Sequence, residues 1–324
     1  MRKSGYKMSR NKKVVVIGGG HGQSTICRGI KYIPNLDITA IVTVADDGGS
    51  TGRLRRQFHI PAMGDIRNVM VALSTSETLM SSLMNYRFDD PDGDEKDIAG
   101  HNLGNLILTA LTQQCGSFLE AIQTIGSVLN VKGKIIPATT QVISLYAVME
   151  DNVIVKGEAN IPDRSNHIRK VFYDELVHAT PEAIQAIKEA DLIIYGIGSV
   201  YTSILPNVII PEIQEALDQT KAKRVYFCNA MTQPGETDGY CMEDHVQALK
   251  RHGAPVDATV IANDVIPEEL IRRYYDEGST PVYVRDATHD YDVIRTSLLS
   301  FEEKYIRHDA SKIQDTIAKL LEEI

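Results

Sequence analysis

Residues 13–30, KVVVIGGGHGQSTICRGI, join an apolar run to a glycine-rich loop and then to a segment with helical spacing. The run 13–17 predicts a buried strand, and Ile26 and Ile30, one helical turn apart, predict a helix behind the loop. Glycines in such a loop permit positive φ and let backbone N–H groups approach an anion at the helix N-terminus. This order predicts an open α/β sheet with a ligand crevice at the carboxyl ends of its strands.

We expect this first loop to hold a phosphate. Gln23 stands where the last glycine of a dinucleotide-binding fingerprint would be, and the loop has no lysine of the P-loop type. The loop therefore predicts phosphate binding through backbone groups, without the spacing of an NAD site. Its candidate residues are Gly18, Gly19, Gly20, Gly22, Gln23 and Ser24.

A second acid-glycine segment, ADDGGSTGRLRR at residues 45–56, ends another apolar run. Asp46 and Asp47 lie close to where a dinucleotide fold places its ribose-binding acid. The two carboxylates are equally suited to a Mg²⁺ ion that bridges phosphates, and the sequence leaves both roles open. Arg53, a few residues later, carries a charge that can neutralise a second phosphate or an acidic substrate.

Two further glycine-bearing segments open apolar helices. In Gly64-Asp65-Ile66-Arg67-Asn68, Asp65 is predicted to cap the helix, whereas Arg67 and Asn68 either reach into the crevice or lie on the surface. At residues 100–105, His101 and Asn102 precede the next helix, and a ligand or proton-transfer role for His101 is as well supported as a structural one. The catalytic candidates are Asp46, Asp47 and His101.

Polar loops also follow two later strands, predicted at residues 191–195 and 223–228. The first is rich in glycine and hydroxyl groups, which suit a phosphate. The second offers amides that can read the edge of a base. The candidates in these loops are Gly198, Ser199, Tyr201, Thr202, Ser203, Asn207, Asn229, Thr232 and Gln233.

The whole chain indicates one large α/β domain. Its 324 residues are 43% hydrophobic and 24% charged, enough for a packed core, and residues 1–12 are expected to be a flexible tail before a single domain at 13–324. We predict a doubly wound, mostly parallel Rossmann-like sheet with helices on both faces and a small β-hairpin insert at about 141–161. Residues 258–262 and 281–284 are predicted strands, and a helix is predicted to follow Asp309.

Charge and cysteine content exclude several classes of function. The net charge of −9, with no basic face, argues against a nucleic-acid partner, and no apolar run is long enough to span a membrane. The four cysteines lack any C-x-x-C pair, which argues against a zinc cage or a disulfide framework. We expect a cytoplasmic protein with reduced thiols. Arg285, Asp286 and His289 either border the ligand or lie on the surface.

Several long motifs occur in one order: VTVADDGGSTGRLRR, PAMGDIRNVMVALS, GHNLGNLIL, GSVYTSILPN and CNAMTQPGET. By these motifs, from about residue 13 to 263, the chain resembles the YvcK family, also called the gluconeogenesis factor family, which is similar to the CofD-like transferases. It departs from the family at His21-Gly22-Gln23, where Thr-Gly-Leu is usual, and at residues 195–198, where the family has Gly-Pro-Gly.

The resemblance implies a regulatory protein that binds a UDP-sugar or another nucleoside diphosphate, is needed for growth and cell shape on gluconeogenic carbon sources, and self-associates. On this reading it has affinity without turnover and acts on a protein partner. The CofD-like branch instead implies a Mg²⁺-dependent transfer of a phospholactyl-type group from a nucleoside-diphosphate donor, with its aspartate pair matched by Asp46 and Asp47. An NAD-dependent oxidoreductase is the weaker third reading, because the glycine spacing fails.

Overall fold

The structure is a computed structural model that describes residues 10–89, 93, 97–163, 166–285 and 287–324. Its centre is a sheet of seven strands in the order β10-β9-β8-β7-β1-β2-β3, and every neighbouring pair is parallel. The expected doubly wound sheet is therefore confirmed. The strands are β1 (Lys12–Gly18), β2 (Leu36–Val42), β3 (Lys134–Pro137), β7 (Leu192–Tyr195), β8 (Lys223–Phe227), β9 (Ala258–Ala262) and β10 (Asp292–Thr296).

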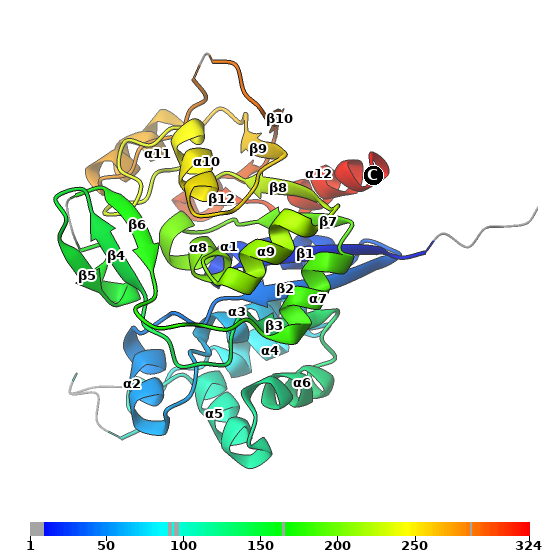
Figure 1. Cartoon of the computed structure of the whole chain (residues 1–324), viewed down its shortest axis with the longest axis vertical. Coiled ribbons are helices and arrows are strands. Elements are labelled where there is room, and N and C mark those ends of the chain that lie inside the picture. Colours follow the sequence, from blue (N-terminus) through cyan, green and yellow to red (C-terminus); the bar gives the residue numbers. More distant parts are fainter. Residues whose placement is uncertain (1–9, 90–92, 94–96, 164–165, 286) are drawn as a thin grey trace, which may run out of the picture.

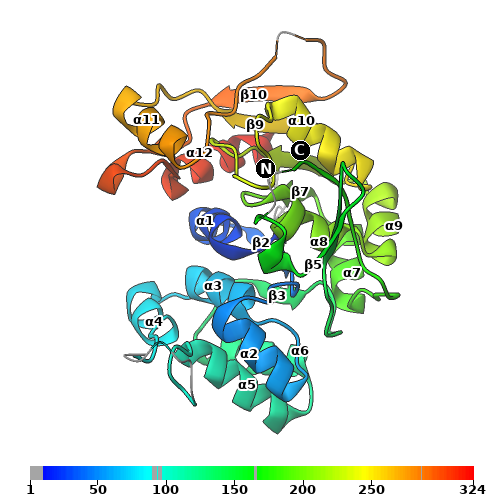
Figure 2. The ribbon, with the colours of Figure 1, turned by 90° about the vertical axis from the view of Figure 1, so that its left-hand side faces the viewer.

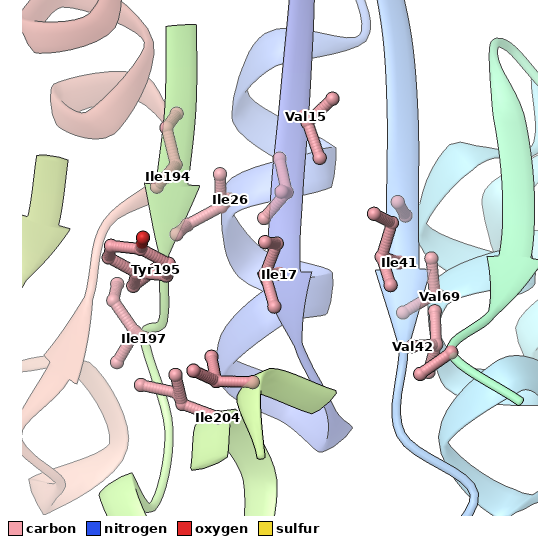
Figure 3. Close-up of a cluster of buried hydrophobic side chains, with 14 of the residues drawn as sticks. Val15, Ile17, Ile26, Ile41, Val42, Val69, Ile194, Tyr195, Ile197 and Ile204 are labelled. Carbon is pink, nitrogen blue, oxygen red and sulfur yellow. The ribbon is translucent and has the colours of Figure 1, made fainter. Parts of the chain in front are cut away.

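The inner strands are buried on both faces, which is why they are continuous apolar runs rather than alternating ones. In β1 the residues from Val14 to Gly18 are all buried. Figure 3 shows Ile17, Ile41 and Ile194 from three neighbouring strands beside Ile26 of the helix behind them. Burial of this surface is the main favourable term in folding the domain.

Helices cover both faces of the sheet, as expected. Helix α1 packs between α3 and α12 on one face, and α7, α8 and α9 lie together on the other (Figure 2). The helices on these faces are α1 (Gly20–Ile30), α3 (Gly64–Leu73) and α12 (Ala310–Glu322), and α7 (Pro181–Glu189), α8 (Leu205–Val208) and α9 (Pro211–Gln219). The helices α10 (Met242–Arg251) and α11 (Glu268–Asp276) follow β8 and β9.

The strand order reverses at β1, whose neighbours are β2 on one side and β7 on the other. Chain connections leave in opposite directions on the two sides of such a point, and open α/β sheets bind their ligands there, outside the carboxyl ends of the strands; we call this region the crevice. All the polar loops predicted from the sequence follow β1, β2, β7 or β8. The fold thus brings them to one edge of the sheet.

A helical lobe, made up of helices α2 to α6, lies between β2 and β3 in the chain and forms the lower part of Figure 1. Helix α5 packs against α2, α4 and α6, and α6 also packs against β3. Its remaining helices are α2 (Gly49–Phe58), α4 (Glu77–Met84), α5 (Leu103–Cys115) and α6 (Phe118–Val128).

The predicted hairpin is present but is part of a larger element. Strands β4 (Tyr146–Met149) and β5 (Ile154–Lys156) pair antiparallel, and β6 (Ile168–Phe172) adds a third strand to β4. A short 3₁₀ turn, η1 (Glu158–Asn160), follows β5. This antiparallel sheet lies beside the carboxyl ends of the central strands (left in Figure 1).

Three boundaries differ from the sequence-based expectation. Residues 1–9 of the predicted tail lie outside the described residues, but Arg10 and Asn11 donate to Asp191 and Asp37, and β1 already begins at Lys12. The predicted strand at 281–284 is wrong: within it Pro281 makes an isolated bridge to Met231, and the last strand of the sheet is β10 instead. The two-residue strands β11 (Leu299–Ser300) and β12 (Arg307–His308) then lead to α12, which follows Asp309 as predicted and is capped by its side chain. Among the described residues no helix has the length and apolar content needed to cross a membrane.

Candidate functional site

The loops after β1 and β7 meet by direct backbone contact. A Cβ atom built on Gly22 would lie 2.2 Å from the carbonyl oxygen of Ile197 and 2.9 Å from the backbone nitrogen of Gly198. Only a glycine permits this approach, so the first turn of α1 is set directly against the loop after β7. The two loops are therefore held against each other at the switch point.

A carboxylate of the chain occupies the anion position of the first loop. The N-cap of α1 is Gly19, which has no side chain to cap the helix, and Gly20 has a φ of 61°. The backbone N–H of Gly20 donates to the carboxylate of Asp65, which lies so close that a Cβ on Gly19 would be 2.4 Å from Asp65 Oδ2. Asp65 therefore does not cap its own helix, whose N-cap is Met63, but stabilises the N-terminus of α1.

The two aspartates after β2 point to different partners. Asp46 accepts from the backbone N–H of Gly48 (2.9 Å) and from the Thr51 hydroxyl, whereas Asp47 accepts from the backbone N–H of Ala159 (3.0 Å) in η1. Asp47 thus ties the crevice to the antiparallel sheet. Among the described residues no three His, Cys, Asp or Glu side chains are grouped to hold a metal ion. A Mg²⁺ ion bridging phosphates would need only one or two carboxylates, so Asp46 and Asp47 stay candidates for it.

A second internal anion, Glu236, organises the loop after β7. Its carboxylate accepts from the hydroxyls of Ser199 and Thr202 (3.1 Å to Thr202), from the Gln233 amide (2.6 Å) and from the backbone N–H of Tyr201. The side chain is only 1% exposed. The hydroxyls expected to bind phosphate are therefore already bound to a carboxylate of the chain.

Burial and mutual repulsion raise the pKa values of the carboxyl groups around the crevice. Burial, followed by the charge of Asp46, raises the pKa of Asp65 to about 7 and that of Glu158, in η1, to about 8. Burial also raises the pKa of Glu236 to about 7 and shifts the pKa of Asp46 upward. The interior of the crevice is thus acidic, and part of its acid is protonated near neutral pH.

These shifts predict that the protein without ligand loses stability as pH rises from about 6.5 to 8.5. The folded pKa values of Asp65 and Glu158 lie above their unfolded values, so the native state binds more protons than the unfolded chain in this window, and raising the pH removes that advantage. The titration of buried His308, whose pKa is lowered to about 4, changes the stability only below about pH 6.5. Urea unfolding across the window measures the effect.

The variant Glu158→Gln serves as the control, because it removes the group that titrates highest in that range. Its unfolding free energy should depend less on pH than that of the wild type between pH 7 and 8.5. Equal slopes for the two proteins would show that Glu158 is ionised throughout and would contradict the acidic-interior description.

Cationic side chains lie at the rim of the crevice. The pKa of His21, in the first turn of α1, is lowered by burial and then by the charges of Arg67, Arg28 and Arg307. Arg67 donates to the side-chain oxygens of Asn105 (3.2 Å) and Asn68 (2.9 Å). The site therefore has an acidic interior and a basic rim.

At the entrance to α5 the predicted polar residues hold the helical lobe together. Asn102 caps the helix by accepting from the backbone N–H of Asn105, and His101, 4% exposed, lies 3.0 Å from the Ser50 hydroxyl through Nδ1. Arg53 donates to the carbonyl of Ala99 (2.6 Å). His101 is thus placed at the contact between α2 and α5.

The structure uses several other predicted ligand residues inside the fold. The Gln23 amide donates to the carbonyls of Val16 and Ile41 and so links β1 to β2, and the Asn229 amide both donates to and accepts from Gly198. Further hydrogen bonds inside the fold join Ser24 to Gly20, Asn207 to Gly18, Tyr201 to Ile168 and Tyr240, and Thr232 to Thr280. Gly18 ends β1, Gly20 begins α1, and Ser203 lies in the helical turn Val200–Ile204 before α8.

The residues around 285–289 form a separate surface cluster. Arg285 pairs with Asp244 (2.7 Å) and His289 with Glu243 (2.8 Å), both in the first turn of α10. Asp286 lies outside the described residues. Arg285 and His289 therefore bind side chains of α10.

Sequence reasoning did not find Glu158, Glu236, Arg307 or the role of His21. Glu236 lies in the quoted motif CNAMTQPGET, where an acid beside hydroxyl-rich loops was the available signal. Glu158 follows β5 and Arg307 lies in β12, and neither has a local pattern that links it to the crevice.

Comparison with known proteins gives one family model and several full-length relatives. The model described as 2-phospho-L-lactate transferase CofD matches residues 14–299. The gluconeogenesis factor of Bacillus subtilis is 44% identical over 98% of this chain and 100% of its own length, and that of Halalkalibacterium halodurans is 43% identical over 95% and 96%. A crystal structure of a Bacillus halodurans protein, 42% identical, superposes with a TM-score of 0.89 over 96% of this chain and 100% of that one.

Proposed function

Since the chain belongs to the CofD family and, within it, to the gluconeogenesis factors, we propose that it is a cytoplasmic regulatory protein that binds a UDP-sugar. In this proposal the occupied crevice changes a surface that a protein partner or a second copy of the chain recognises. It supports growth and cell shape on gluconeogenic carbon sources through that contact.

One observation carries the proposal: the first loop is shaped around an anion. The N-terminus of α1 has no side-chain cap of its own and receives the Asp65 carboxylate instead. A diphosphate offers the same kind of acceptor oxygens, with more charge, to the same N–H groups and to the helix dipole. The nearby cations Arg67 and Arg307 favour a dianion in that position.

The bond between Asp47 and Ala159 supports a regulatory role. It links the loop after β2 to η1, next to the antiparallel sheet, so a ligand that moves the loop also moves η1. The sheet has exposed side chains, Ile154 of β5 among them, so a displacement of the sheet changes the molecular surface. Binding at the crevice is thereby connected to a surface.

The alternative is a Mg²⁺-dependent transferase of the CofD type. Asp46 and Asp47 are the residues that would hold the ion, and both would have to release their present partners to do so. With its donor bound, this alternative predicts loss of turnover on Asp47→Asn and donor binding retained.

Calorimetric titration with UDP-N-acetylglucosamine, GDP and NAD, each with and without Mg²⁺, tests the proposal. We expect micromolar binding of the UDP-sugar without Mg²⁺ and recovery of the ligand intact. Preference for GDP with Mg²⁺, or any consumed donor, would favour the transferase, and binding of NAD alone would favour an oxidoreductase.

The same titration has a pH signature. Protonation of Asp65, whose pKa is about 7, removes the carboxylate charge that competes with the diphosphate. Affinity should therefore rise as pH falls from 8 to 6.5, by up to about tenfold per pH unit. Asp65→Asn should bind with little dependence on pH, and an unchanged pH profile in this variant would remove Asp65 from the phosphate position.

A further inference from the structure

Arg67 is a half-buried cation held by neutral groups. Its two terminal nitrogens donate to Asn105 and Asn68, and its Nε atom is buried without a hydrogen-bond partner. Its stem lies against the first turn of α5, so closely that a Cβ on Gly104 would be 2.8 Å from Arg67 Cδ. The side chain is therefore fixed in one position by packing.

No carboxylate of the described residues forms an ion pair with Arg67 or with its neighbour Arg87. Arg87 donates to the carbonyl of Gly100, and after burial its charge is the largest cause that lowers the pKa of Arg67. A cation that is removed from water is normally paired with an anion. Arg87 is exposed, and the charges of Asp65 and Asp46 act on the half-buried Arg67 without forming an ion pair with it. The pair of adjacent cations therefore has room for an anion that a ligand supplies.

The position of Arg67 relative to the first loop defines which part of the ligand it meets. Asp65, two residues earlier on α3, holds the N–H of Gly20, and the charge of Arg67 acts on His21 beside it. The loops after β7 and β8, with Asn229, lie on the other side of β1. A nucleotide sugar with its diphosphate over α1 and its base toward β8 therefore points its sugar at Arg67.

We propose that the helical lobe carries a second anion subsite, formed by Arg67 and Arg87, which takes a carboxylate on the sugar of a UDP-sugar. The proposal rests on the proposed function, because it assumes a diphosphate at α1. A planar carboxylate can accept from the two terminal nitrogens of Arg67 together, in place of the Asn105 and Asn68 side chains, which is a paired arrangement that arginine favours. A neutral hydroxymethyl group would leave the arginine charge uncompensated.

UDP-glucuronate and UDP-glucose are the matched probes, because they differ only in a carboxylate and a hydroxymethyl group on the sugar. We expect the wild-type protein to bind UDP-glucuronate about tenfold more tightly than UDP-glucose in calorimetric titration, as befits one charge-assisted contact. In Arg67→Gln the ratio of the two dissociation constants should fall to near one. Arg67→Lys keeps the positive charge but lacks the planar guanidinium with its paired donors, so it should retain part of the preference for UDP-glucuronate.

Arg272→Gln is the control for loss of one positive charge. Arg272 lies on α11, is 81% exposed and is paired with Glu268, outside the crevice, so its variant should keep the wild-type ratio. Circular dichroism and the affinity for UDP-glucose show whether each variant is folded. Because the readout is a ratio, a general loss of affinity in Arg67→Gln does not imitate the expected result.

The outcomes separate this inference from the proposed function. Equal affinity of the wild-type protein for both ligands, or a preference that survives in Arg67→Gln, overturns the second subsite and leaves UDP-sugar binding in place. Failure of the wild-type protein to bind either ligand overturns the proposed function, and with it the subsite.

Discussion

Gly22→Ala is expected to destabilise the protein, to displace α1 from the sheet and to abolish ligand binding. The new methyl group would lie 2.2 Å from the carbonyl oxygen of Ile197 and 2.5 Å from its carbonyl carbon, and both atoms are backbone held between β7 and the loop that follows. A side chain can turn away from such a clash, but this backbone cannot, so α1 must move off the sheet. We expect a loss of at least about 3 kcal/mol in unfolding free energy, the upper end of overpacking effects.

Urea unfolding and titration with UDP-N-acetylglucosamine measure this result, and Gly126→Ala is the matched control. Gly126 lies within α6, and a Cβ there meets no atom within 4 Å. The same chemical change should therefore raise stability by up to about 1 kcal/mol through helix propensity. A Gly22→Ala protein that unfolds at the wild-type urea concentration would contradict the close contact of α1 with the loop after β7.

Glu236→Leu is expected to have an effect of similar size. The carboxylate is 1% exposed and receives donors from Ser199, Thr202, Gln233 and the backbone of Tyr201. Leucine has a similar size but accepts no hydrogen bond, so these donors would be buried without partners. Each such loss costs about 1–3 kcal/mol, and we expect a total of about 3–5 kcal/mol with some relaxation of the loop.

Glu236→Gln separates the charge of this side chain from its hydrogen bonds. Glutamine resembles the protonated acid, and burial raises the pKa of Glu236 to about 7, above its unfolded value. The contribution of Glu236 to the unfolding free energy therefore falls as pH rises from about 4.5 through 7. We expect Glu236→Gln to cost about 1–2 kcal/mol at pH 5.5 and less at pH 8. A cost that grows with pH would show that the ionised form is the stabilising one.

The inner part of the sheet could be predicted because each strand is a local apolar run. The runs at β1, β2, β7, β8 and β9 were recognised, as was the helix α12 after Asp309. The last strand was placed wrongly at 281–284, because the edge strand β10 is only half buried and its residues, DVIRT, have no apolar run. An edge strand is determined by its neighbour, here β9, rather than by its own composition.

The glycine loops of the candidate site were also predictable, since a strand, a loop and a helix are consecutive in the chain. The internal carboxylates were not, because their partners are distant: Asp47 binds Ala159, 112 residues away, and Glu236 binds Ser199, 37 residues away. For the same reason the Asn229 and Gln23 amides, expected to face a ligand, satisfy backbone groups of other segments. Which side chain satisfies a buried polar group thus depends on the tertiary structure and not on the local sequence.

The Asp65 carboxylate at the N-terminus of α1 also affects the choice of chemical probes. A compound that imitates a nucleotide sugar normally keeps the diphosphate and must then displace or protonate this acid. A uridine derivative that carries an amidine in place of the phosphates would pair with Asp65 as it stands and leave the loop in its present shape. Such an inhibitor would block the crevice best at alkaline pH, where the natural anion competes least.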